Sequence, residues 1–344
     1  MPKAEFLYLS QEDVIAAGGL NMGKCIEAVE EALACHVRED MVLPSKTVVR
    51  WGDVKTEAIM GRINAMPAYI GGRVNKAGIK WMGSSPLNPK KFELPRASGV
   101  LILNDPETKL PIAIMDATII SAMRTGAVGG IGMKYLSRKD SGVMGIIGAG
   151  VQARTQALAA KTVFPGLEKI LVYDIFPERI GTWCREMSTK LQISCQSAKS
   201  AEEAVRESNF FVTVTTAHEP IVRKDWIQPG QTFIHMGGYE DEVGVVKRAD
   251  KIVVDSWKEI YHRGLQTLVI AYEQKIVTEK DIYAEIGEII IGQKKGREND
   301  KEFIYYNTIG MGIEDVAFGT WILEEAKKEG IGITLPLWKN PIWI

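Results

Sequence analysis

The stretch GIIGAGVQARTQ, residues 145–156, decides the fold. A short apolar run at 143–147 leads directly into the glycine motif, and a segment of helix-forming residues follows it. In this context Gly148 permits a tight turn, Gly150 lets the backbone approach a pyrophosphate, and Ala153 lets the helix pack against the strand. The first N–H groups of the helix then face the phosphates. The stretch therefore predicts a dinucleotide-binding βαβ unit.

An acidic residue follows the next predicted strand. The run Lys-Ile-Leu-Val-Tyr-Asp at 169–174 predicts a strand that ends in Asp174. An acid at this place hydrogen-bonds a ribose 2′-hydroxyl and repels a 2′-phosphate, so the sequence favours NAD over NADP as cofactor. Further predicted cofactor contacts lie at the start of the helix and at the ends of two later strands: Val151, Gln152, Thr215 and Gly237.

Strands and helices alternate from residue 143 onward. The pattern predicts an α/β fold with a doubly wound parallel sheet, the Rossmann fold. Predicted strands lie at 143–147, 169–173, 210–215, 232–236, 251–254 and 303–307. The stretch 258–300 reads as helical and charged, and the loop at 84–91 as exposed.

Both ends of the chain remain outside this central fold, so we expect them to fold together. Residues 1–125 and 308–344 are predicted to form a discontinuous α+β substrate-binding domain, and residues 126–307 the NAD-binding Rossmann domain. We expect the cleft between two such domains to hold the substrate against the nicotinamide.

The composition excludes several classes of protein. The chain has 344 residues, of which 46% are hydrophobic and 25% charged, which is typical of a globular protein large enough for two domains. A net charge of −1 gives no electrostatic basis for binding nucleic acid or a membrane surface. No apolar run spans a bilayer, and no signal peptide is recognised. Four scattered cysteines indicate a reducing cytoplasm, and four scattered histidines predict no metal site.

Six short segments along the chain carry a second signal. They are Met-Pro-Ala-Tyr at 66–69, Gly-Ile-Lys-Trp at 78–81, Arg-Ala-Ser-Gly at 96–99, Ser-Ala-Met-Arg-Thr at 121–125, Gly-Ala-Gly at 148–150 and Gly-Met-Gly-Ile-Glu-Asp at 310–315. Together, and in this order, they resemble the ornithine cyclodeaminase/mu-crystallin family. The resemblance implies an NAD(P)-binding Rossmann domain, a discontinuous second domain that forms a homodimer, and action on the C–N bond of small amino acids or cyclic imines.

The resemblance also assigns candidate residues. The family's strand lysine matches Lys80, whose apolar neighbours suggest a partly buried ammonium group, and burial makes a lysine usable as an acid or base. The family's helix arginine matches Arg124, which is suited to a bidentate grip on a substrate carboxylate. A second carboxylate partner falls in Pro-Ser-Lys-Thr-Val-Val-Arg at 44–50, where either Lys46 or Arg50 fits; strand alternation puts both on one face.

The chain departs from the cyclodeaminases at two acidic positions. They carry an Asp directly after the Gly-Gly that matches residues 237–238, whereas Tyr239 stands here and is followed by Glu240. They also carry a Glu where this chain has Asn64. Glu240 is the candidate to replace the missing Asp as a catalytic residue, and Asp241 is the alternative. The loss of both acids argues against true ornithine cyclodeamination.

Four further segments resemble the diaminopropionate-biosynthesis branch of the family, the N-(2-amino-2-carboxyethyl)-L-glutamate dehydrogenases. They lie at 88–91, 248–257, 284–288 and 296–298. The expected function is therefore NAD-dependent oxidation of an amino acid or opine-like secondary amine to an imine that is then hydrolysed, or imine reduction as the reverse. The alternatives are an ornithine cyclodeaminase with catalytic NAD and a non-catalytic, mu-crystallin-like ligand-binding protein.

Overall fold

The computed structural model describes residues 3–51 and 61–342, and it divides the chain into two compact units. Unit 1 comprises Met1–Arg124 and Met311–Ile344, and unit 2 comprises Thr125–Gly310. The first boundary lies inside helix α3 (Thr118–Leu136), so one helix carries the chain from one unit into the next. The sequence places the boundaries after residues 125 and 307, close to these positions.

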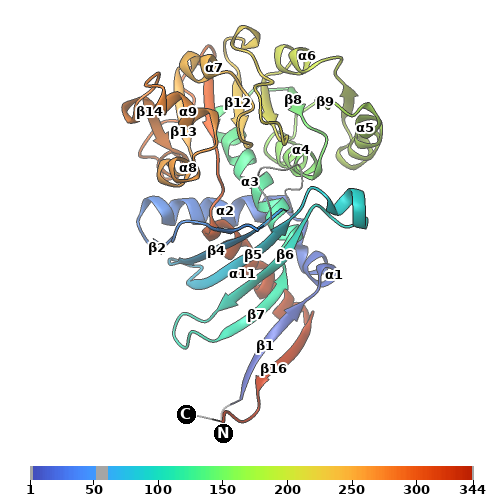
Figure 1. Ribbon diagram of the computed structural model, residues 1–344, viewed down its shortest axis with the longest axis vertical. Coiled ribbons are helices and arrows are strands. Elements are labelled where there is room, and N and C mark those ends of the chain that lie inside the picture. The colour runs from blue at the N-terminus through green and yellow to red at the C-terminus, as the bar shows by residue number, and fades with distance from the viewer. Residues whose placement is uncertain (1–2, 52–60, 343–344) are drawn as a thin grey trace. The chain divides into compact units, whose positions relative to one another are not determined.

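Unit 2 is built on an eight-stranded sheet in which every pair of neighbouring strands is parallel (Figure 1). Its strand order is β10 (Ser194–Ser197), β9 (Lys169–Tyr173), β8 (Val143–Ile147), β11 (Phe210–Thr213), β12 (Thr232–His235), β15 (Ile304–Asn307), β13 (Lys251–Val254) and β14 (Ile282–Glu285). The order reverses between β8 and β11, where ligands bind in open α/β sheets. The predicted Rossmann fold is confirmed.

Helices and short helical turns connect these strands. They are α4 (Val151–Val163), α5 (Pro177–Leu191), α6 (Ala201–Arg206), η3 (Lys224–Trp226), α7 (Val243–Arg248), α8 (Trp257–Arg263), α9 (Thr267–Glu273), η4 (Glu279–Asp281) and α10 (Ile286–Ile290). One expectation is wrong here: the stretch 258–300 is not only helical, because it contains the edge strand β14.

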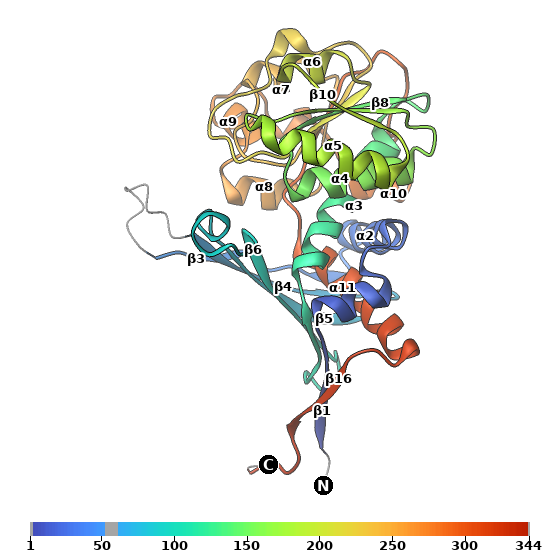
Figure 2. The ribbon, with the colours of Figure 1, turned by 90° about the vertical axis from the view of Figure 1, so that its right-hand side faces the viewer.

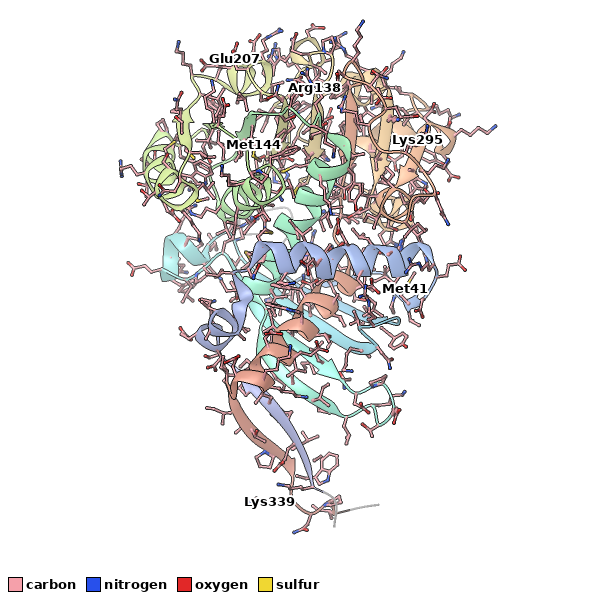
Figure 3. The ribbon with its side chains drawn as sticks, turned by 180° about the vertical axis from the view of Figure 1, so that it is seen from behind. Met41, Arg138, Met144, Glu207, Lys295 and Lys339 are labelled. Atoms are coloured by element: carbon pink, nitrogen blue, oxygen red, sulfur yellow. The ribbon has the colours of Figure 1, made fainter. Side chains whose placement is uncertain are left out.

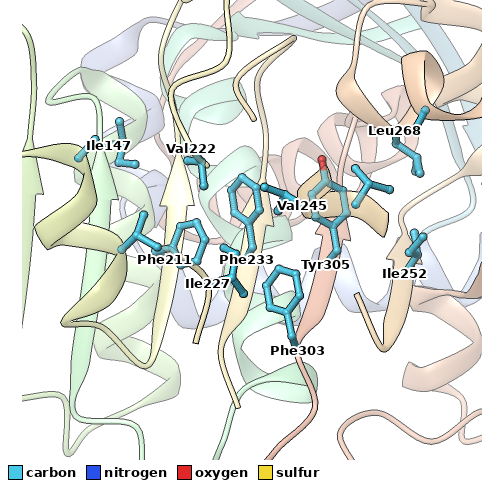
Figure 4. Close-up of a cluster of buried hydrophobic side chains, with 14 of the residues drawn as sticks. Ile147, Phe211, Val222, Ile227, Phe233, Val245, Ile252, Leu268, Phe303 and Tyr305 are labelled. Atoms are coloured by element: carbon cyan, nitrogen blue, oxygen red, sulfur yellow. The ribbon is translucent and has the colours of Figure 1, made fainter. Parts of the chain in front are cut away.

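Aromatic side chains fill the core between the central strands of unit 2 (Figure 4). The rings of Phe211 and Phe233 stack with centroids 4.5 Å apart, and Tyr305 meets Phe233 edge-on at 5.2 Å. All residues of β11, β12 and β15 are buried, as parallel strands covered on both faces require. This rigid core places the carboxyl ends of the strands, where the predicted cofactor residues lie.

Unit 1 contains a second, mostly antiparallel sheet. Its strand order is β16 (Ile333–Trp338), β1 (Ala4–Leu9), β7 (Pro111–Asp116), β6 (Ala97–Asn104), β5 (Lys76–Ser84), β4 (Arg62–Ile70) and β2 (Met41–Val42), and β3 (Thr47–Val49) also pairs with β4. The remaining elements are α1 (Gln11–Val14), η1 (Ile15–Gly19), α2 (Met22–Val37), η2 (Asn88–Phe92) and α11 (Gly312–Glu329). The loop predicted at 84–91 therefore contains part of the exposed turn η2.

Helices cover one face of this sheet. Helix α11 packs on β4, β5 and β6, and α2 packs on α11, so both lie on the same side (Figures 2 and 3). Side chains on that face are buried: Met66, Ala68, Lys80, Met82, Leu101 and Leu103. Large apolar side chains on the other strand positions remain exposed: Tyr8, Trp81, Val100, Ile333 and Leu335. The alternation follows from the two-residue period of a strand.

Candidate active site

Two cations and two carboxylates form a buried cluster in unit 1. The Lys80 ammonium, on β5, donates to both oxygens of Asp315 at 2.7 and 2.9 Å. Arg124, on α3, donates from Nε to Asp315 Oδ1 at 3.2 Å and from Nη1 to Glu314 Oε2 at 2.8 Å. Lys80 also donates to Ser121 Oγ at 3.1 Å. Two positive and two negative groups thus balance in the interior, as buried charges require.

The pKa of Lys80 is the chemical consequence of this cluster. The side chain is 2% exposed. Burial, and then the positive charge of Arg124, lower the pKa of Lys80 to about 8, although the attraction of Asp315 opposes both. A lysine with this pKa exchanges a proton near neutral pH, whereas an ordinary lysine stays charged. Lys80 is therefore equipped as an acid or base.

Helix α11 delivers both carboxylates. Glu314 and Asp315 lie in its first turn, where the helix dipole favours negative charge, and both side chains are fully buried. The sequence alone assigns no role to these two acids or to Ser121. Both acids belong to the segment 310–315 that resembles the family. Acids at the start of a helix are common on protein surfaces, so the role of these two becomes visible only from the cations that they contact, Lys80 and Arg124.

The strand register places the two candidate partners of Arg124 differently. Thr47 pairs with Ala65, and Met66 pairs with Lys80, so Lys46 lies level with Lys80 across β4. Val49 pairs with Ile63, so Arg50 lies level with Arg62 instead, four residues further along the strand. Alternation puts Lys46 and Arg50 on the face that carries Lys80. Continued by one residue at each end, this register places Lys46 nearer than Arg50 to the level of Lys80.

The glycine motif in unit 2 has the geometry of a phosphate-binding loop. Gly148 has φ +104°, and its N–H donates to the Tyr173 carbonyl at 2.7 Å. A Cβ there would lie 2.9 Å from the Val214 carbonyl oxygen, so the turn itself demands glycine. At Gly150 a Cβ would meet no protein atom within 4 Å. The protein therefore leaves this side of Gly150 open, which fits the close approach of a pyrophosphate.

The start of α4 also fits a dinucleotide. Gly150 is its N-cap and no side chain caps the helix, so its first N–H groups remain available to an anion. Val151 is exposed, Gln152 is half-buried, and Ala153 is buried against the sheet. Asp174 Oδ2 accepts from Ala149 N at 2.7 Å, so the predicted ribose-binding acid also holds the glycine loop.

Glu240 occupies a different environment from the one that its predicted role requires. Its side chain is fully buried in unit 2. Oε2 accepts from Thr213 Oγ1 at 2.7 Å, and Oε1 accepts from Thr215 N and Oγ1 at 2.7 and 2.6 Å. The carboxylate also lies against Gly237, where a Cβ would overlap it. These contacts argue against Glu240 as the group that activates water; they indicate a residue that positions Thr215 and Gly237.

Asp241, the neighbouring acid, is also enclosed. Its Oδ1 accepts from Thr267 Oγ1 at 2.7 Å and from the Tyr305 hydroxyl at 3.3 Å, and His235 Nε2 lies 3.4 Å away. Burial raises the pKa of Asp241 to about 6.

Within residues 3–51 and 61–342, no three His, Cys, Asp or Glu side chains are arranged to hold a metal ion. No helix in the same residues is long and apolar enough to cross a membrane.

Comparisons with known proteins agree with this geometry. Residues 7–330 match the model of the ornithine cyclodeaminase/mu-crystallin family. The chain is 37% identical over 335 residues to the N-((2S)-2-amino-2-carboxyethyl)-L-glutamate dehydrogenase of Staphylococcus aureus, covering 97% of this chain and 99% of the relative.

Two solved structures are also similar. Delta(1)-pyrroline-2-carboxylate reductase of Thermococcus litoralis, in complex with NADH and L-proline, has a TM-score of 0.88 at 36% identity and covers 95% of this chain and 99% of its own. An archaeal alanine dehydrogenase dimer with bound NAD has a TM-score of 0.87 at 33% identity and covers 97% of this chain and 100% of its own. The chain therefore belongs to the ornithine cyclodeaminase/mu-crystallin family.

Proposed function

We propose that the chain is an NAD-dependent oxidoreductase that acts on the C–N bond of an amino acid or an opine-like secondary amine. The observation that carries this proposal is the buried Lys80, whose pKa of about 8 suits proton transfer at an amine. The relatives support it, because they are named as dehydrogenases and an imine reductase of amino-acid substrates.

Unit 2 supplies the residues for the cofactor. We assign the pyrophosphate to the open side of Gly150 and the N–H groups of Val151, Gln152 and Ala153, and the adenosine ribose to Asp174. Thr215 and Gly237 complete the set, held in place by Glu240. The carboxylate of Asp174 repels a 2′-phosphate, which favours NAD over NADP. NAD supplies a hydride acceptor at its nicotinamide.

Unit 1 supplies the residues for the substrate. Arg124 and Lys46 orient the α-carboxylate, and the guanidinium plane of Arg124 is itself fixed by Glu314 and Asp315. Neutral Lys80 accepts the amine proton at Nζ as the Cα–H bond breaks and the C=N bond forms. Lys80, again neutral after releasing that proton, then removes a proton from the water that adds to the imine carbon and passes it to the nitrogen, which takes the C=N electron pair. The C–N bond of the resulting carbinolamine then breaks, so that the protonated amine leaves and the 2-oxo acid forms. Imine reduction follows the same path backwards, with the Lys80 ammonium as the acid.

We also propose that the chain forms a homodimer through the uncovered face of the unit 1 sheet. That face carries the exposed side chains of Tyr8, Trp81, Val100, Ile333 and Leu335, and an apolar surface of this kind is typical of subunit interfaces. Sedimentation velocity should give a dimer for the wild type and a monomer for Trp81→Glu.

We also propose a cytoplasmic location, because all four cysteines are free thiols.

Absorbance at 340 nm tests the proposed activity. Purified protein, NAD and a panel of amino acids, diamino acids and carboxyethyl-amino acids should yield NADH and a 2-oxo acid in equal amounts with one class of substrate. Lys80→Met should abolish turnover but keep NADH binding, measured by fluorescence. Consumption of ornithine to proline and ammonia without net NADH would instead establish the cyclodeaminase, and turnover retained in Lys80→Met would remove Lys80 from its role.

A further inference from the structure

Three arginines gather at one end of the unit 1 sheet. Arg62 begins β4 and pairs with Ser84 of β5, and Ser84 pairs in turn with Ala97 of β6, directly after Arg96. The Ser85 N–H donates to the Arg96 carbonyl at 2.9 Å, which holds Arg96 beside the end of β5. Arg50 follows β3 and lies level with Arg62 on the other side. Neighbouring strand ends therefore bring the backbones of three arginines together, and the positive charges of Arg50 and then Arg96 act on Arg62.

No acid neutralises this arginine cluster within the described part of the chain. Arg62 is half-buried, and burial together with the positive charges of Arg50 and then Arg96 lowers its pKa. The two charged groups that lower the pKa of Arg62 are thus both cations. No ion pair joins any of the three arginines to a carboxylate of the described residues. Like charges held together without a counter-charge destabilise the free protein, so such a cluster is suited to an anionic ligand.

One polar side chain, Asn64, lies on the Lys80 face between the level of Arg62 and the level of Lys80. Along β4, Met66 lies level with Lys80, Asn64 with Met82, and Arg62 with Ser84. These positions alternate with the opposite face, so Lys80, Asn64 and Arg62 point to the same side. Asn64 Oδ1 is buried and has no hydrogen-bond partner among the residues that the structure describes. This amide oxygen is therefore able to accept a hydrogen bond from a polar ligand group or from water.

We propose that Arg62, with Arg50 and Arg96, binds a second carboxylate of the substrate, remote from the reacting C–N bond, while Asn64 contacts the chain between the two ends. The inference rests on the proposed function and narrows it to amino acids with a distal carboxylate. Four residues of strand separate the Lys80 and Arg62 positions, which is about 13 Å between backbones. Both side chains are long, so a shorter ligand reaches both charged heads.

A matched pair of substrates tests the proposal. The probes are N-(2-amino-2-carboxyethyl)-L-glutamate, its γ-carboxamide analogue and L-alanine, each assayed with NAD at 340 nm. We expect the wild type to prefer the γ-carboxylate over the γ-carboxamide by about 10- to 100-fold in kcat/KM, mainly through KM, as one charged hydrogen-bonded pair provides. Arg62→Gln should remove this preference while leaving the γ-carboxamide and alanine nearly unchanged, and Arg62→Lys should restore part of it.

Control variants separate binding from folding. Arg73→Gln makes the same substitution at an exposed arginine that pairs with Glu31, and should change no kinetic constant. Arg96→Gln, at an exposed position, should reproduce a weaker form of the Arg62→Gln effect even if that variant folds poorly. Equal losses on both probes in the Arg62 and Arg96 variants, or no preference in the wild type, would overturn the inference.

Calorimetric binding separates this inference from the proposed function. If the wild type produces no NADH from any probe, the proposed function fails. The proposed carboxylate site at the arginine cluster would then still be supported if the wild type binds the γ-carboxylate probe more tightly than the γ-carboxamide probe and Arg62→Gln abolishes this difference. Equal binding of both probes would refute the cluster as a carboxylate site whatever the activity.

Discussion

Replacing Asp315 with Asn should destabilise the protein by an amount that depends on pH. In the wild type, Lys80 has a pKa of about 8 and is mostly protonated at pH 7, with Asp315 among the groups that keep it so. Without the carboxylate, Lys80 and Arg124 face each other with one negative charge fewer, and the pKa of Lys80 falls further. We expect the folded variant to hold Lys80 neutral at pH 6 and 7, whereas the unfolded chain protonates it at a pKa of about 10.4.

The magnitude follows from proton linkage. One pKa unit corresponds to about 1.4 kcal/mol, so losing the Lys80 proton costs about 1.4 kcal/mol at pH 7 and about 2.7 kcal/mol at pH 6, relative to the wild type. The lost charge-assisted hydrogen bonds of Asp315 add about 1.5–3 kcal/mol at every pH. The folded variant binds one proton fewer than its unfolded chain, so its stability rises with pH. Below pH 8, Lys80 contributes no such slope to the wild type, because it is protonated in both states.

Urea unfolding of both proteins at pH 6, 7 and 8, followed by tryptophan fluorescence, measures this difference. We expect the destabilisation by Asp315→Asn to shrink by about 1.4 kcal/mol for each unit of rising pH. In a Lys80→Met background the same substitution should have a pH-independent effect, because the titrating group is gone. A destabilisation of equal size at all three pH values in the Lys80 protein would refute the account of the cluster.

Three further predictions concern catalysis and cofactor binding. For amine oxidation, kcat/KM should rise tenfold per pH unit up to a pH of about 8 and then level off, because neutral Lys80 is the base. In Asp315→Asn the rising part of the pH profile should move to lower pH. A rising part that does not move would assign the titration to the substrate amine. Gly150→Ala should weaken NADH binding, measured by fluorescence titration, without lowering the melting temperature, whereas Gly148→Ala should lower the melting temperature because of its positive φ. Glu240→Gln should raise the Kd for NADH by about tenfold through Thr215, and unchanged binding would make Glu240 purely structural.

Local patterns predicted the Rossmann half of the chain closely. The expected strands at 143–147 and 169–173 coincide with β8 and β9, and α4 is the helix expected after the glycine motif, because apolar runs and glycines mark the ends of these elements. The strands β1, β14 and β16 were not predicted. β1 pairs with β16 from the opposite end of the chain, so the contacts that stabilise these two strands lie outside any local window.

The candidate site divides in the same way. Lys80 and Arg124 stand out because charged residues with apolar neighbours imply burial, and the family resemblance names them. Asp315 lies 235 residues from Lys80, and nothing near either residue predicts their contact. The proposed role of Glu240 rested on its position beside a missing family acid, whereas its hydrogen bonds to Thr215 depend on how a loop folds back on β11. Residue type is local information, but hydrogen-bond partners are not.

The choice between Lys46 and Arg50 shows what register adds. The sequence makes them equivalent, because a spacing of four puts both on one strand face. Pairing with β4 separates them, since Lys46 lies level with Lys80 and Arg50 with Arg62. A slip of one residue would turn both cations to the opposite face, so the proposed roles of Lys46 and Arg50 depend on the β3–β4 register. On this face of the sheet we therefore assign the proposed chemical step to the residues level with Lys80 and the proposed substrate selection to the residues level with Arg62.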